Sequence, residues 1–176
     1  GVEGDKVAAL VSKVYPDFLL NYRDPTYLSS CSIVCPNNAT VNDVNNYVLS
    51  LVPGDTIQYL SCDVIAKSSE HIPDFDVLYP TEFLNSIDAN NFPTHKLELK
   101  KGAIVMLLRN LNQNKGLCNG TRLLVTQLGQ RILHCVALTG SNVGEEVLIP
   151  RIALNTTDVK WPFTLQRHQF PVRLCY

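Results

Sequence analysis

The stretch from Gly102 to Leu124 carries polar and basic side chains that could bind a polyanion. It reads GAIVMLLRNLNQNKGLCNGTRLL, in which an apolar run, a polar loop and a second apolar run predict a β-hairpin. Amides and cations stand between and beside the two runs, namely Arg109, Asn110, Asn112, Gln113, Asn114, Lys115, Asn119 and Arg122. Such donors suit phosphate oxygens. A hydrophilic hairpin loop without a ligand would have the same composition, and Asn-Gly is a turn signal in its own right.

A second candidate site lies at the predicted start of a helix. Residues 31–35, CSIVC, are short, apolar and partly β-branched, which favours a buried strand of a parallel sheet. A helix is expected from about residue 40 to 52. Asn37, Asn38 and Thr40 lie between them, where free backbone N–H groups and the helix dipole can bind an oxyanion. The same residue types would be chosen for capping alone, so both interpretations stay open.

Other chemistry is not supported by the residue spacing. The sequence contains no G-x-x-x-x-G-K-[ST], the phosphate-binding loop that holds ATP and Mg²⁺ in P-loop enzymes. No arrangement of serine, histidine, cysteine and acid indicates a nucleophile, so we predict no catalytic residues. The six cysteines are scattered without a C-x-x-C pair, which argues against a metal site and favours free thiols, namely Cys31, Cys35, Cys62, Cys118, Cys135 and Cys175.

Charge is unevenly distributed along the 176 residues, although the formal net charge is only −1. Residues 1–95 contain 12 acids and 4 bases, whereas residues 96–176 contain 11 bases and 4 acids. The basic half is where a polyanion would dock. Two oppositely charged faces that attract each other within one fold are the alternative. No apolar run reaches the roughly 20 residues needed to span a bilayer, and we expect an intracellular protein.

The periodicity changes near residue 97 and indicates two kinds of structure. Before it, apolar spacing within residues 5–20 predicts a helix that ends near Pro16, followed by a strand over 58–65 and a short helix over 81–87. After it, short apolar runs separated by glycine-containing turns predict strands at 97–99, 103–108, 122–128, 131–138 and 146–149. Closely spaced short strands of this kind favour a small β-barrel.

Aromatic residues surround two cationic side chains near the end of the chain. Trp161, Phe163 and Phe170 flank Arg167 and His168. Such a mixture can stack on bases, but aromatic side chains next to prolines more often seal a junction in the core. We expect packing.

Several blocks of the sequence resemble one helicase family. The hairpin segment is similar to the G-x-x-V-M-L-L-x-N-L…G-L-x-N-G segment of the petite-integration-frequency (Pif-one type) DNA helicases, especially those of plant Helitron elements. Further blocks follow in the family's order: SIVCPNNATVNDVN at 32–45, YLSCDVI at 59–65, YPTEFLNSI at 79–87, VLIPRIAL at 147–154 and QFPVRLCY at 169–176. At the fourth helicase motif, P-T-N in the family, Asn38 matches the asparagine, while Asn37 replaces the threonine that donates to phosphate.

The resemblance implies an α/β fold with a small β-barrel, in which part of a RecA-like parallel sheet of the P-loop NTPase type carries an SH3-like insertion. Residues 1–78 would form the first part of the second RecA-like domain. Residues 79–158 would form the inserted barrel with a short leading helix, and residues 159–176 would return to the RecA-like domain, which this chain contains only in part.

The implied function is part of an ATP-dependent 5′→3′ DNA helicase that binds single-stranded DNA and closes against a first RecA-like domain. DNA contacts would fall on Asn37, Asn38, Thr40, Arg109, Asn110, Lys115, Asn119 and Arg122. ATP and Mg²⁺ would belong to the intact helicase, so this chain alone is expected to be inactive as an ATPase. DNA repair, recombination, telomere maintenance or Helitron transposition in the nucleus are the implied roles. A stand-alone DNA- or protein-binding module, or a truncated transposon-derived remnant, is the alternative.

Overall fold

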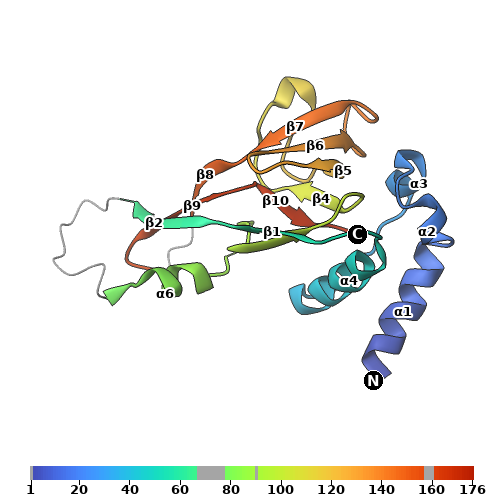
Figure 1. Cartoon of the computed structure of the whole chain (residues 1–176), viewed down its shortest axis with the longest axis horizontal. Helices are drawn as coiled ribbons and strands as arrows, with labels where there is room; N and C mark the ends of the chain where they lie inside the picture. The colour runs from blue at the N-terminus through green and yellow to red at the C-terminus, as the bar shows by residue number, and fades with distance from the viewer. Residues whose placement is uncertain (1, 67–77, 90, 157–160) are drawn as a thin grey trace.

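Helices and strands occupy separate parts of the molecule (Figure 1). The computed structural model describes residues 2–66, 78–89, 91–156 and 161–176. The first four helices lie together at one side of the strands, and a fifth, α6, lies under the opposite end (Figure 1). Their bounds are Val2–Val14 for α1, Phe18–Asn21 for α2, Pro25–Ser30 for α3, Asn38–Leu51 for α4 and Thr81–Ser86 for α6.

The helix predicted from about residue 5 to near Pro16 is present as α1, and it starts earlier, at Val2. It ends at Val14, and Asp17 adopts a left-handed conformation with φ 54° before α2 begins. Asp24 then caps α3 by accepting a hydrogen bond from the Thr26 backbone N–H at 2.9 Å. Pro16 thus lies between α1 and α2, and the cap at Asp24 starts α3 as a separate helix.

The described strands form three antiparallel sheets. Five strands pair in the order β10-β4-β5-β6-β7, three in the order β2-β9-β8, and β1 pairs with β3. The five-stranded sheet and the others have these bounds: Ile57–Leu60 (β1), Cys62–Ala66 (β2), Lys96–Leu99 (β3), Ile104–Leu107 (β4), Arg122–Leu128 (β5), Ile132–Ala137 (β6), Glu146–Pro150 (β7), Ile152–Asn155 (β8), Thr164–Gln169 (β9) and Val172–Leu174 (β10).

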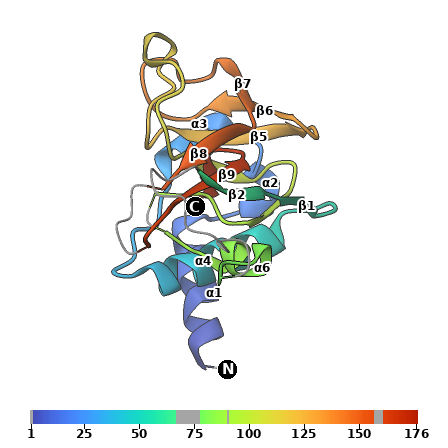
Figure 2. The same cartoon turned by 90° about the vertical axis from the view of Figure 1, so that its left-hand side faces the viewer.

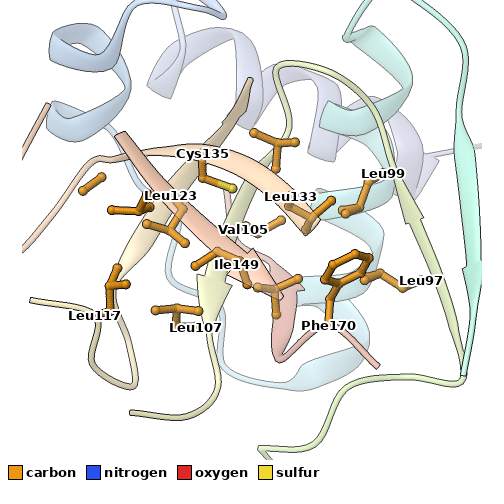
Figure 3. Packing of buried hydrophobic residues seen from close by; sticks show 14 of the residues in the cluster. Leu97, Leu99, Val105, Leu107, Leu117, Leu123, Leu133, Cys135, Ile149 and Phe170 are labelled. Carbon is orange, nitrogen blue, oxygen red and sulfur yellow. The ribbon is translucent and has the colours of Figure 1, made fainter. Parts of the chain in front are cut away.

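Alternating apolar side chains build the core on one face of the five-stranded sheet (Figure 3). In β6, Leu133 and Cys135 are buried while the residues beside them are more exposed, which is the period of two that a half-buried strand requires. Leu123 and Ile149 enter the same cluster from the neighbouring strands, and Phe170 packs there as well. Each fully buried side chain of this size stabilises the fold by roughly 1.5–3 kcal/mol.

The opposite face of the sheet packs against the helices. Ile104 and Leu124 belong to a second cluster with Leu28 of α3, Val48 of α4 and Tyr15, which directly follows α1. Helices and strands thus pack against each other, and the coarse prediction of a mixed α and β fold is correct.

The predicted parallel strand at residues 31–35 is wrong. In the described part of the chain, this segment belongs to no sheet, every strand pairing is antiparallel, and Val34 is 94% exposed. One backbone hydrogen bond, from Ile33 N–H to the Tyr176 carbonyl at 3.4 Å, joins the segment to the end of the chain. A strand is stabilised by a ladder of such bonds and by cover on its faces, and this segment has little of either.

The strands expected after residue 97 are confirmed within one or two residues. β3 to β7 fall on the five predicted runs, while β8 and β9 were not predicted. The strand expected at residues 58–65 is in fact two, because Ser61 separates β1, which pairs with β3, from β2, which pairs with β9. Closure into an SH3-like barrel and the domain limits at residues 78 and 158 stay predictions, and residue 158 lies outside the described part.

Candidate functional site

The loop between β4 and β5, residues 108–121, holds itself in shape through short local contacts. It contains a 3₁₀ turn, Gln113–Lys115, that Asn112 caps by accepting a hydrogen bond from the Lys115 backbone N–H at 3.2 Å. Gly116 follows in a left-handed conformation with φ 64°. Leu117 is buried and anchors the loop to the core. The loop therefore presents its polar side chains from a defined backbone rather than from a random coil.

Some of the predicted donors and acceptors of this loop serve its structure. The Asn110 side-chain oxygen accepts a hydrogen bond from the Asn119 backbone N–H at 2.7 Å and closes the loop. The Thr121 hydroxyl donates to the Gly116 carbonyl at 3.0 Å. The side chains of Lys115 and Asn119 are exposed and point a cation and an amide to the surface. These two remain available for an external ligand.

Arg109 is half-buried and joins the loop to a neighbouring segment. Its Nη1 atom donates to the carbonyls of Asn91 and Leu108, both at 2.9 Å. Asn91 has φ 54°, so this contact fixes a left-handed residue in the approach to β3. These two hydrogen bonds use part of the guanidinium to hold the loop in place. The solvent-facing side of the guanidinium contributes its positive charge to the loop surface.

The prediction that Arg122 belongs to the loop surface is wrong. Arg122 is 9% exposed, and its Nη1 atom donates to the Leu28 carbonyl at 3.5 Å. Arg122 and Leu124 share one face of β5, and that face packs against the helices, whereas Leu123 faces the core on the other side of the sheet. The alternation of side chains along β5 buries Arg122 against the helices. Its nearness to the Asn-Gly turn in the sequence does not indicate this burial.

Burial around Arg122 also affects a tyrosine. The low-dielectric surroundings raise the pKa of Tyr15 to about 12, although the Arg122 guanidinium acts in the opposite direction. The Tyr15 hydroxyl donates to the Cys31 carbonyl at 3.3 Å. Within the described residues, the Nε and Nη2 atoms of Arg122 have no hydrogen-bond partner.

Asn37, Asn38 and Thr40 form the start of α4, as expected, but the cap is Asn37. Its side-chain oxygen accepts hydrogen bonds from the Thr40 backbone N–H at 2.9 Å and the Thr40 hydroxyl at 3.0 Å. The capping interpretation is confirmed for this pair, which satisfies its polar groups locally. Asn38 is the first helical residue and is exposed. The helix starts two residues before the predicted position.

The two groups of predicted site residues do not form one site. The loop between β4 and β5, drawn in yellow, lies at the top of both views, and α4 lies near the bottom (Figures 1 and 2). The chain therefore offers two separate polar surfaces, one on the loop and one at the start of α4.

The structure contains a buried ionic cluster that was not predicted from the sequence. Arg167 in β9 and Asp63 in β2 are both fully buried, and their shortest contact joins Nη2 to Oδ2 at 2.6 Å. The guanidinium also donates to the carbonyls of Leu84, Ile87 and Pro93 at 2.9 to 3.2 Å. Because the two residues are 104 positions apart, only the β2–β9 register brings them together.

This cluster is structural, although a serine and a histidine adjoin it. The Ser61 hydroxyl donates to Asp63 Oδ1 at 2.6 Å and lies 2.8 Å from His95 Nδ1. A nucleophilic serine would direct its proton to the histidine. Here the hydroxyl donates its hydrogen bond to the Asp63 carboxylate, which is itself held by Arg167, so His95 is not placed to act as a general base for Ser61.

Packing is the role of the aromatic residues near the end of the chain, as predicted. Phe163 and Phe170 are buried, and the rings of Trp161 and Phe83 meet edge-to-face with centroids 5.1 Å apart. Arg167 is fully buried, with its guanidinium carbon 5.2 Å from the centroid of the Phe92 ring, which excludes its stacking on an external base.

In the described part of the chain, the histidine, cysteine and acidic side chains form no group of three suited to a metal ion. None of the helices in this part has the length and apolar character that crossing a membrane requires. The six cysteines are free, and Cys135 is the one that is fully buried.

Comparison with known proteins supports the resemblance seen in the sequence. Residues 82–128 match the family model described as DNA helicase Pif1, 2B domain. This segment contains α6, β3, β4, the loop and β5. A comparison with curated proteins finds no match.

Solved structures of Pif1 helicases share the fold. A structure of two coordinating Pif1 helicases at forked double-stranded DNA has a TM-score of 0.54 and 20% identity, over 98% of this chain and 36% of that one. Bacteroides Pif1 bound to single-stranded DNA gives 0.53 and 22%, over 81% and 29%. Candida albicans Pif1 gives 0.54 and 21%, over 93% and 43%. The present chain thus spans well under half the length of these relatives, and the predicted likeness to a fragment of a Pif1-type helicase is confirmed.

Proposed function

We propose that this chain, which carries a match to the Pif1 2B domain, is part of an ATP-dependent 5′→3′ DNA helicase. We further propose that it contributes contacts to single-stranded DNA. The observation that supports this most directly is the coincidence of the matched segment, residues 82–128, with the loop that carries the exposed donors. Bacteroides Pif1, one of the proteins that share the fold, has been solved bound to single-stranded DNA.

The loop has the chemistry that a sequence-independent DNA contact needs. The Lys115 ammonium supplies charge for a phosphate, and the Asn119 amide supplies a neutral donor beside it. Arg109 adds a cation whose position is held by two backbone carbonyls. Arg122 and Arg167 are buried, so they are excluded from the DNA surface that we propose.

The start of α4 is the second contact that we propose. Asn38 is exposed at the first helical position, where backbone N–H groups and the helix dipole favour an anion. Asn37 and Thr40 bond to each other and would act by holding this end of the helix.

ATP hydrolysis would come from elsewhere in the intact helicase. The sequence lacks the phosphate-binding loop, so we place ATP and Mg²⁺ on a first RecA-like domain, against which this part would close. The nucleus is the compartment that we propose, with repair, recombination, telomere maintenance or Helitron transposition as the candidate processes. In-frame genomic sequence upstream that encodes a G-x-x-x-x-G-K-T-like loop would support this arrangement.

Salt-dependent DNA binding tests the proposal. Affinity for a fluorescent single-stranded oligonucleotide should fall with salt, because cationic contacts release counterions from the phosphates. Replacing Lys115 by alanine should weaken binding and lower the slope of log K against log salt by about one, the value for one phosphate contact.

Lys13→Ala is the matched control, since Lys13 is an exposed cation on α1, far from the loop (Figure 1). The control should keep the slope of the unmodified chain. Equal slopes for the Lys115 and Lys13 variants, or no binding at low salt, would reject the loop as a DNA contact.

A further inference from the structure

A cavity of about 260 Å³ lies between α4, β3 and β10, away from the loop. Its apolar lining consists of Leu97, Val172 and Leu174. Leu97 and Val172 are buried parts of the sheet core and therefore form a firm base. The volume is below the 300–1,000 Å³ that is usual for drug-sized ligands, so a smaller group fits it.

A buried asparagine in the lining of this cavity joins α4 to the end of the chain. Asn45 is 4% exposed; its Nδ2 atom donates to the Leu174 carbonyl at 2.9 Å, and its Oδ1 atom accepts from the Tyr176 N–H at 3.0 Å. Both bonds join α4 to the end of the sheet. The cavity is therefore preformed, because a buried amide with both polar ends satisfied resists displacement.

Two exposed amides stand on the helix side of the cavity. Asn42 and Asn46 are one helical turn apart on α4, so they lie on the same face and both line the cavity. Each amide carries two N–H donors and one carbonyl acceptor. This rim can recognise a ligand edge on which donors and acceptors alternate.

Charged side chains on the sheet side balance one another. Arg173 Nη2 lies 3.7 Å from Asp88 Oδ1, and Lys96 Nζ lies 2.8 Å from Glu98 Oε1. All four residues line the cavity, which holds two cations and two anions. A phosphate or carboxylate would find no net attraction here. The ligand class that fits is small and uncharged, with an apolar part for Leu97, Val172 and Leu174 and polar groups for the asparagines.

We propose that this cavity binds one unstacked nucleobase of single-stranded nucleic acid, with Asn42 and Asn46 contacting its polar edge. Unstacked bases are the part of a single strand that side chains can reach on their hydrogen-bonding edges. The inference rests on the proposed function for the nature of the ligand. It adds a base contact on α4 that differs from the phosphate contact on the loop.

Nuclear magnetic resonance with adenosine and thymidine tests the proposal, because nucleosides lack the phosphate on which the loop depends. We expect the side-chain amide signals of Asn42 and Asn46 to shift on titration, with little dependence on salt. The double variant N42A/N46A should lower the affinity for the nucleoside by at least about tenfold, as expected for the loss of two neutral hydrogen bonds. Gln130→Ala is the control, because it removes an exposed amide in the turn between β5 and β6, outside both the cavity lining and the proposed DNA loop, and should leave the affinity unchanged.

The outcomes separate the two proposals. Oligonucleotide binding without any nucleoside-induced shift at Asn42 and Asn46 would overturn the base cavity and leave the proposed function intact. Nucleoside binding without oligonucleotide binding would support the cavity and reject the loop contact. Equal nucleoside affinity of N42A/N46A and the unmodified chain would also overturn the cavity, provided that both give dispersed spectra of a folded protein.

Discussion

Arg122 and Arg167 show how differently two buried arginines can be accommodated. Arg167 uses its donors on Asp63 and on three backbone carbonyls, so its charge and its hydrogen-bonding capacity are both satisfied. Arg122 has one long bond, to the Leu28 carbonyl at 3.5 Å, and no ion pair is found for it among the described residues. A buried cation without a partner costs free energy, whereas a paired one mainly fixes geometry.

Removing Arg167 should destabilise the fold strongly. In Arg167→Met the side-chain volume is roughly kept, but the Asp63 carboxylate stays buried without a counter-ion, so we expect a loss of about 3–5 kcal/mol in the free energy of unfolding. Urea unfolding followed by circular dichroism measures it. The double variant D63N/R167M should recover part of the loss. A single variant as stable as the unmodified chain would contradict the stabilising role of this pair.

At the scale of elements, the strands of the five-stranded sheet differ sharply from the segment that leads into α4. β5 and β6 lie inside the sheet and pair on both sides, and β4 likewise has β10 and β5 as neighbours. Residues 31–35 have one backbone hydrogen bond to Tyr176, and the side chains at positions 32 and 34 are exposed. Local stability follows buried apolar contacts and protected hydrogen bonds.

Rates of amide hydrogen exchange should therefore differ between the central strands of the five-stranded sheet and the segment before α4. We expect amide protons of β4, β5 and β6 to be the slowest, and those of residues 31–37 to exchange orders of magnitude faster, because opening the latter breaks few contacts. Mass spectrometry of peptic fragments measures both. As a reference within the same experiment, α4 should be well protected, since Val44 and Val48 are buried. Equal protection of residues 31–37 and β5 would show that the segment is paired.

At the scale of the whole molecule, the two hydrophobic clusters on either side of the five-stranded sheet contain ionisable groups whose neutral form is favoured by burial. Burial raises the pKa of the Cys135 thiol and of the Tyr15 hydroxyl to about 12 in each case, and it also raises that of Tyr176. Cys135 lies in the sheet core and Tyr15 in the cluster shared with the helices. Both halves of the fold are therefore sensitive to alkaline pH.

Stability should fall as the pH rises from 9 towards 12. In the unfolded chain the Cys135 thiol ionises near its ordinary value of 9.0, but the folded chain keeps it neutral up to about pH 12. This contribution is fully present below pH 9 and is lost at up to about 1.4 kcal/mol per pH unit above it. Urea unfolding at several pH values tests this, and Cys135→Ala should flatten the fall between pH 9 and 10. An unchanged slope in that variant would exclude the thiol as its source.

Local pattern was sufficient for the strands β3 to β7 and for the existence of α4. Alternation of apolar residues and glycine-containing turns are properties of neighbouring residues, so the strand positions could be predicted within one or two residues. The exposed loop residues Lys115 and Asn119 and the exposed Asn38 could be found for the same reason. The resemblance at residues 82–128 likewise depends on a contiguous segment.

Tertiary structure alone decided which side of the protein each polar residue faces. Arg122 is buried because its face of β5 packs against the helices, and the Asp63–Arg167 pair exists because β2 and β9 pair in one register. Ser61 divides one apolar run because the two strands beside it have different partners. Residues 31–35 have strand-like composition but little backbone pairing. Pairing and burial depend on residues distant in sequence, and the order of residues within one segment does not contain that information.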